Sequence, residues 1–170
     1  MFDKINRSLK GYLNIWKKPI NGDTILMHSN QNIILDCYHD NLANAAISSI
    51  NDDDYKKIIP VELHLDNQGV DEEDNVITPT KEDRIDPTDE DYYYHNVTEK
   101  VIGEETNYAK FTTILGLGDA NGHVFSRAML TGDTEDTEGN IEDVGISLKC
   151  FRETPKDNDW ELIFEWTIFY

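Results

Sequence analysis

Basic residues are scarce in this chain, and their scarcity narrows the range of partners. The 170-residue sequence has 15 Lys and Arg against 34 Asp and Glu, a formal net charge of −19 at pH 7. A nucleic-acid-binding protein needs a basic surface, and an anionic membrane attracts basic segments. We therefore expect neither nucleic acid nor a membrane as a partner. The acidic balance suits a soluble protein with a basic partner or with divalent cations.

Cysteines and long apolar runs are also scarce. Cys37 and Cys150 are the two cysteines, and no CxxC motif is present. This favours free thiols in a reducing cytoplasm, with one long-range disulfide as the alternative. The chain has no run of about 18 apolar residues and does not open with the basic and apolar regions of a signal peptide. We therefore expect no secretion signal and no transmembrane span.

Motifs for catalysis and metal binding are absent as well. The histidines lack the spacing of a zinc site; they are His28, His39, His64, His95 and His123. Cys37 and His39 are too close in sequence to align as nucleophile and base. Glu161 and Glu165 would lie about 13–14 Å apart along a strand, whereas glycosidase carboxylates lie roughly 5–10 Å apart. We therefore expect a non-enzymatic protein that has no cofactor and no resident metal.

Strict alternation is what the chain has instead, and it is clearest at the C-terminal end. One face of residues 160–170 would carry Trp160, Leu162, Phe164, Trp166, Ile168 and Tyr170. The other face would carry Glu161, Ile163, Glu165, Thr167 and Phe169. This pattern predicts a β-strand that covers a core. Because the second face is partly apolar, the strand is either covered on both sides or turns that face toward another chain.

Similar patterns predict the rest of the fold. Alternation predicts strands over residues 12–17, 24–28, 59–65, 97–102, 108–115, 124–130 and 144–150. Turns at 21–22 and 116–122 predict two hairpins, 12–17 with 24–28 and 108–115 with 124–130. Polar residues at 30–32 interrupt the pattern, and a spacing of four predicts one short helix over 36–49. We therefore predict a single all-β domain over residues 1–170, mainly an antiparallel β-sandwich or jelly roll, with one short α-helix and long acidic loops.

Charge is unevenly distributed along this domain. Residues 1–18 carry five bases, Lys4, Arg7, Lys10, Lys17 and Lys18, against the single acid Asp3. A basic segment on an acidic body suits head-to-tail or lateral docking of subunits, and the alternative is an ordinary basic surface strand. We take these five bases and the neighbouring Trp16 as candidate partner-binding residues.

The acidic loop 66–95 is the other candidate interaction element. Residues 66–91 hold eleven acids against Lys81 and Arg84. A loop of this length is usually functional, bound to a partner or disordered. It ends in three adjacent aromatics, Tyr92, Tyr93 and Tyr94, which cannot all point into one core. Because tyrosine is enriched at interfaces, we take them as candidate partner-binding residues that reach a neighbouring protein.

Calcium binding is an alternative for the acidic segments. The ligands would be Asp71, Glu72 and Asp74, or Asp133, Glu135 and Asp136 in a second acidic loop over 131–143. Neither loop fits the EF-hand pattern, so solvated or partner-facing loops are favoured.

Several segments, taken in order, match a pattern found in one family. Residues 32–36 (Asn-Ile-Ile-Leu-Asp) precede 41–43 (Asn-Leu-Ala), and a strand containing Phe111 precedes a glycine-rich turn. Residues 141–146 (Ile-Glu-Asp-Val-Gly-Ile) and the ending 155–170 follow. In this order the segments resemble small structural proteins of tailed-bacteriophage virions, found in tails, collars and tail-fibre attachments. The resemblance implies no catalytic residues.

Together these observations lead to one functional hypothesis and one alternative. The hypothesis is a non-enzymatic virion protein, assembled in the host cytoplasm, that packs as a ring or junction component of the neck, collar, tail or baseplate. Its partners would be other virion proteins, including portal or neck, tail or fibre components, and further copies of itself. The alternative is a carbohydrate-binding β-sandwich that uses Tyr92–Tyr94. A calcium-dependent form of this alternative would also use calcium held by the acidic loops.

Overall fold

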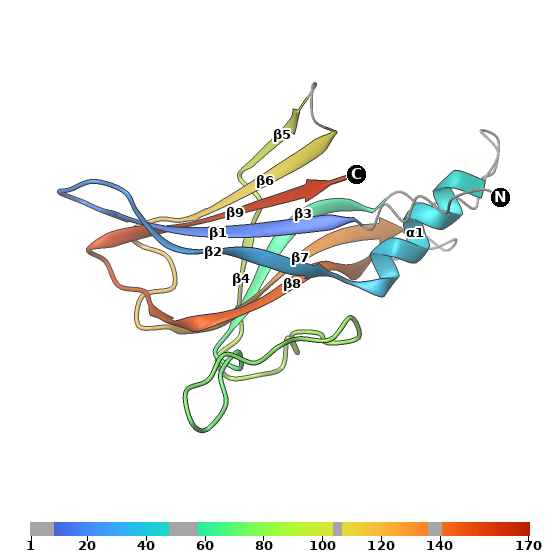
Figure 1. Cartoon of the computed structure of the whole chain (residues 1–170). Helices are drawn as coiled ribbons and strands as arrows, with labels where there is room; N and C mark the ends of the chain where they lie inside the picture. Colours follow the sequence, from blue (N-terminus) through green and yellow to red (C-terminus); the bar gives the residue numbers. More distant parts are fainter. Residues whose placement is uncertain (1–8, 48–57, 104–106, 136–140) are drawn as a thin grey trace.

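The computed structural model describes residues 9–47, 58–103, 107–135 and 141–170 (Figure 1). They form one helix and nine strands, with all strand pairs antiparallel. The elements are β1 (Lys10–Pro19), β2 (Ile25–Ile34), α1 (Asp36–Ile47), β3 (Ile59–Asp66), β4 (Tyr93–Asn96), β5 (Glu99–Gly103), β6 (Tyr108–Leu115), β7 (Val124–Glu135), β8 (Ile141–Pro155) and β9 (Trp160–Phe169). The predicted mainly antiparallel β fold with one short helix is confirmed.

The nine strands form one curled sheet in the order β4-β3-β7-β8-β2-β1-β9-β6-β5. We call β2, β1, β9, β6 and β5 the first half and β4, β3, β7 and β8 the second half. The halves are joined where Ile33 and Ile34 of β2 pair with Leu148 and Ser147 of β8. A second link forms beyond β4, where the backbone N–H of Val97 donates to Val61 in one half and the N–H of Thr98 donates to Thr112 in the other.

The main core lies between the two halves. The first half contributes fully buried side chains that include Leu13, Ile15, Leu162, Phe164 and Trp166. The second half contributes Leu63, Leu65, Phe125, Leu130 and Phe151 to the same cluster. Alternate residues of a strand point to opposite faces, so each of these strands also has an outer face. The predicted core face is confirmed for Leu162, Phe164, Trp166 and Ile168, which are all buried, whereas Tyr170 at its end is 46% exposed.

The predicted first hairpin is confirmed, but β2 is longer than the sequence pattern indicated. It continues through the polar residues 30–32 and pairs with β1 as far as Asn32 and Gly11. Asn32 is buried and occupies the space that a side chain at Gly11 would need, because a Cβ there would lie 1.9 Å from Asn32 Oδ1. The polar residues did not end the strand because glycine on the neighbouring strand leaves room for one of them.

The predicted hairpin of 108–115 with 124–130 is wrong. Both strands exist, but β6 pairs with β9 and β5, whereas β7 pairs with β8 and β3. The connection over 116–123 therefore carries the chain from the first half to the second. In this arrangement β6 forms eight residue pairs with β9, and β7 forms eleven with the 15-residue β8, more than the eight residues of β6 could offer it. A glycine-rich turn indicates a change of direction and does not by itself select the pairing partner.

The predicted second acidic loop over 131–143 is also wrong for most of its length. Strand β7 continues to Glu135, β8 begins at Ile141, and Asp133 pairs with Asp143. Residues 136–140 lie outside the described residues. Backbone pairing satisfies the main-chain groups whatever the side chains are, so acidic composition was not sufficient to predict a loop.

Candidate protein-interaction surfaces

The three predicted basic residues that the structure describes, Lys10, Lys17 and Lys18, are not gathered into one patch. Lys4 and Arg7 lie outside the described residues. Lys10 is exposed at the start of β1, and Lys17 and Lys18 lie near its end. At about 3.3 Å per residue, seven residues of strand separate Lys10 from Lys17 by roughly 23 Å.

Lys17 and Lys18 also have partners within the chain. The Nζ of Lys17 lies 3.2 Å from the ring centroid of Trp160, a cation–π contact. The Nζ of Lys18 lies 2.9 Å from Oε2 of Glu161. Both contacts join β1 to β9, so these two lysines contribute to the sheet as well as to surface charge.

The structure also separates the three tyrosines predicted to bind a partner. The Tyr93 ring lies in the core side of β4, 5.5 Å from the His123 ring and 6.0 Å from the Phe125 ring. Its burial, aided by the nearby charge of Asp119, raises the pKa of the Tyr93 hydroxyl. A side chain in this position supports the fold and is not available as a docking residue.

Tyr92 and Tyr94 lie together on the opposite side. Their rings stack at 6.1 Å, and the hydroxyl of Tyr92 is 3.2 Å from Nδ1 of the buried His64. Tyr94 is 56% exposed. Among the predicted tyrosines, Tyr94 therefore remains the one with a largely free ring.

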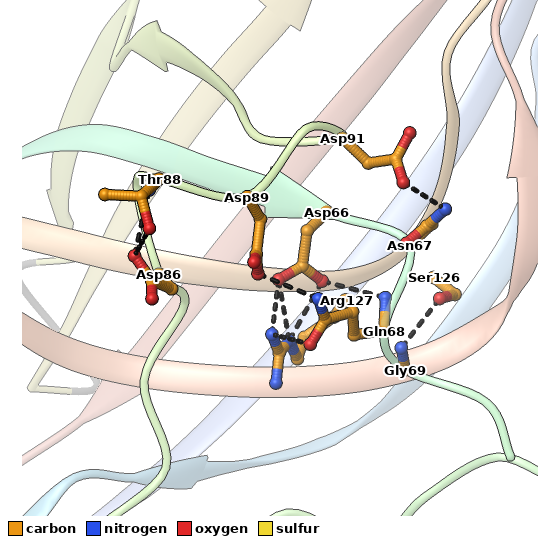
Figure 2. A network of polar contacts seen from close by, with 10 residues as sticks. All are labelled: Asp66, Asn67, Gln68, Gly69, Asp86, Thr88, Asp89, Asp91, Ser126 and Arg127. Carbon is orange, nitrogen blue, oxygen red and sulfur yellow. Dashed lines mark hydrogen bonds and ion pairs between the residues drawn. The ribbon is translucent and has the colours of Figure 1, made fainter.

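The outer face of the second half is covered by the chain itself, through residues 67–92. A buried ion pair anchors this segment: Asp66, at the end of β3, is 0% exposed and accepts hydrogen bonds from Nε and Nη2 of Arg127 on β7 (Figure 2). Burial by itself would lower the pKa of Arg127, but the hydrogen bonds and charge of Asp66 hold it above its ordinary value. Asp66 also accepts from the backbone N–H of Gln68 at 3.0 Å.

Further hydrogen bonds fix the segment that begins at Asn67 (Figure 2). The side-chain amides of Asn67 and Gln68 donate to Asp91 and Asp89 at 2.7 and 2.8 Å. The backbone N–H of Gly69 donates to Oγ of Ser126 at 2.8 Å. Only glycine permits this approach, because a Cβ at position 69 would lie 1.9 Å from the Ser126 carbonyl oxygen.

A small apolar cluster lies beneath the same segment. Its buried members are Leu35, Ile85, Met129, Leu148 and Cys150, with Ile33, Cys37 and Tyr92 packed against them. Cys37 and Cys150 are both free thiols. Burial raises the pKa of Cys150 to about 11, so its thiol stays neutral at physiological pH. The neutral, buried Cys150 acts here as a small apolar side chain.

Several aspartates of this segment form hydrogen bonds within it. Backbone N–H groups of Asn75, Thr80 and Thr88 donate to Asp71, Asp83 and Asp86, and these bonds lower the pKa of each carboxyl. Among the described residues, no group of three or more His, Cys, Asp or Glu side chains is arranged to hold a metal ion. The calcium ligands considered at 133–136 lie partly outside the described residues.

The outer face of the first half is left open by the described part of the chain. Three aromatic rings cross it in a row: Tyr12 on β1, Phe169 on β9 and Tyr108 on β6, with centroids 5.9 Å apart at each step. Tyr12 is 40% exposed, and Phe169 is exposed to a similar degree. A second row of cross-strand neighbours is formed by Trp16, Ile163 and Ile114. We call these six residues the open face.

Polar contacts at the centre of the open face join the same three strands. Glu165 on β9 accepts a hydrogen bond from Asn14 Nδ2 at 3.3 Å and pairs with Nζ of Lys110 at 3.1 Å. The sequence indicated Trp16 as a candidate and identified Ile163 and Phe169 as an unusual second apolar face. It did not indicate Tyr108 or Ile114, because their position beside β9 depends on a pairing that the sequence pattern missed.

Comparison with known proteins gives no further guide to these surfaces. No protein-family model, curated protein or solved structure matches the chain. Within the described residues no helix is long and apolar enough to cross a membrane.

Proposed function

We propose that this chain is a non-enzymatic structural protein of a tailed-bacteriophage virion, which packs in a ring or at a junction of the neck, collar, tail or baseplate. The observation that carries the assembly role is the open face. Large apolar side chains on an exposed sheet are typical of surfaces that meet another protein. The virion assignment itself is supported by the resemblance of residues 32–43, 141–146 and 155–170 to phage structural proteins.

In this proposal the curled sheet acts as a rigid sandwich-like body. Its two halves pack face to face over one core, as the two sheets of a β-sandwich do. The outer face of one half is then free to meet a neighbouring protein. The open face would dock on a second copy or on another virion protein. Lys10 and the more N-terminal bases Lys4 and Arg7 would steer acidic neighbours into place.

The first experiment is light scattering over a concentration series, with and without calcium. A multimer that is indifferent to calcium is the expected result. Ile163→Glu places a charge in the open face and should shift the protein to monomer. Ile102→Glu is the matched control, because Ile102 is 80% exposed on the edge strand β5 and does not belong to the open face. A monomer at every concentration would contradict the ring. Detection of the chain at fixed copy number in purified particles would test the virion assignment.

One observation favours the alternative of a carbohydrate-binding module. Stacked, exposed aromatic rings bind sugar faces, and Tyr94 over Tyr92 has this form. A glycan screen on wild type and Tyr94→Ser separates the two functions. Sugar binding that is lost in Tyr94→Ser would replace the assembly proposal, whereas normal assembly of Tyr94→Ser without any glycan effect would support it.

A further inference from the structure

A groove separates β2 from β8 on the side away from the open face. The two strands pair only at Ile33–Leu148 and Ile34–Ser147 among the described residues, and they diverge from that point (Figure 1). The groove has a volume of about 550 Å³. Its lining comes from both strands and from one loop residue: Met27, His28, Asn30, Val76, Lys149, Cys150, Arg152, Glu153 and Thr154.

Both walls of this groove are strand edges without a strand partner on the groove side. β2 pairs with β1 over residues 25–32, and β8 pairs with β7 over most of its length. Each strand therefore has one paired edge and, beyond the junction at Ile33–Leu148, one edge that no described strand occupies. Such an edge is a template for an added strand, because its main-chain donors and acceptors lack sheet partners.

Apolar side chains on β2 are exposed on both faces of the strand beside this edge. Ile25, Leu26 and Met27 are 51%, 45% and 49% exposed. Met27 lies at a register shift, between the pairs Trp16–Leu26 and Ile15–His28. Three successive exposed apolar residues at a sheet edge would normally be a liability for aggregation. An added strand would cover them.

The charge in the groove indicates which kind of strand would fit. Lys149 is partly buried, and its Nζ has no hydrogen bond and no ion pair with any described residue. Burial lowers its pKa, because the charged form is partly desolvated there. Nε2 of His28 is buried without a hydrogen-bond partner, and burial together with Lys149 lowers the pKa of His28. Glu153 is the one acid in the lining, beside the second cation Arg152.

We propose that this groove binds an extended, acidic segment of a partner protein, which adds a strand to the free edge of β2 and places a carboxylate on Lys149. The inference is independent of the open face, which lies on the other side of the first half. A carboxylate at Lys149 compensates a cation in a partly desolvated site, where an ion pair is stronger than on the surface. A polypeptide suits the groove better than a small anion, since only a polypeptide also uses the strand edge and covers Met27.

The test is a selection from a displayed library of random linear peptides. It is run in parallel on the wild-type chain, on Lys149→Glu and on Lys100→Glu. Lys100 lies exposed on β5, so Lys100→Glu makes the same charge change away from the groove. Wild type and Lys100→Glu should enrich peptides that alternate apolar and acidic residues. Lys149→Glu should bind those peptides about tenfold to a hundredfold more weakly, as expected for a lost charged hydrogen bond.

Amide hydrogen exchange on the wild-type protein gives a second readout that needs no variant. The strongest enriched peptide should slow exchange in β2 over residues 28–32 and in β8 over 149–153. The inference is overturned by a selection that shows no preference for acidic peptides, by equal affinity for wild type and Lys149→Glu, or by protection that appears elsewhere, for example on the open face.

Discussion

The two outer faces of the curled sheet differ in whether another segment of the chain covers them. The outer face of the second half has a buried ion pair and a small apolar cluster, and residues 67–92 of the same chain cover it. The outer face of the first half has a comparable set of large apolar side chains, but the described chain leaves them exposed or half-buried. On both faces the apolar residues follow the alternation of the strands. The faces differ because residues 67–92 cover only one of them.

Because of this difference, we expect one face to contribute mainly to the stability of the fold and the other mainly to association. Residues under the covering segment are desolvated in the folded chain, and their contacts contribute to the free energy of folding. Residues on the open face keep part of their contact with water on folding, and burial of that remaining surface would contribute to association. The chain uses many acids to cover one face, and three of them, Asp71, Asp83 and Asp86, accept hydrogen bonds from the segment's own backbone N–H groups. The uncovered face is therefore the one to test for a partner.

The largest expected effect is a difference in the free energy of unfolding between alanine variants of two neighbouring residues on β9. Phe164 is fully buried between the halves, whereas Ile163 belongs to the open face. Phe164→Ala should lower the free energy of unfolding by about 3–5 kcal/mol because it leaves a cavity. Ile163→Ala should cost about 1 kcal/mol or less. Urea denaturation followed by tryptophan fluorescence measures both. Equal losses would mean that the open face is part of the folding core.

The next effect compares an ion pair on each face. Asp66→Ala leaves Arg127 partly buried without its carboxylate and should cost about 3 kcal/mol. Glu165→Ala removes the partner of Lys110 on the open face and should cost less than about 1 kcal/mol, because that pair is reached by water. Thermal denaturation of both variants gives the comparison. Asp66→Ala should also speed amide exchange over 67–92, and unchanged exchange there would show that the ion pair does not hold the segment.

Alanine substitutions at two glycines test how closely the covering segment must approach β7. Gly69→Ala forces a Cβ against the Ser126 carbonyl and should cost about 2 kcal/mol through a backbone shift. Gly118→Ala is the control, because a Cβ there meets nothing within 4 Å. Chemical denaturation of the two variants should differ accordingly. A neutral Gly69→Ala would mean that the segment can move away from β7 at no cost.

The last effect is confined to alkaline pH, where the covered face should lose stability. The pKa of Cys150 is raised to about 11 in the folded chain, whereas an unfolded cysteine titrates at roughly 8.5. The unfolded chain therefore loses this proton first, and stability should fall as pH rises from about 8.5 toward 11. Denaturation midpoints over this range should decline more steeply in wild type than in Cys150→Ala. Parallel profiles would show that the thiol is not protected by the segment.

Part of this architecture follows from local pattern. The alternation in 160–170 predicted β9, its buried face and its unusual apolar second face, because a strand that is buried on one face has apolar residues at every second position. The turn at Asn21-Gly22 fixed the first hairpin, since only a few residues separate its strands. Asp36 at the start of a spacing of four predicted α1. Each of these depends on contacts between residues that are close in sequence or on a single face of one element.

The rest was decided by contacts between distant residues. Turn chemistry at 116–122 indicated a reversal but not the partner, and β6 and β7 joined different halves, β6 beside β9 and β7 beside β8. Asp66 and Arg127, 61 residues apart in the sequence, form the buried ion pair at which the acidic segment leaves the sheet. The same pairing of β6 with β9 assembled the open face from three strands. Sequence therefore determined which residues are apolar and how they alternate. Only the tertiary structure determined which of those faces the chain covers, because covering a face depends on where remote segments return.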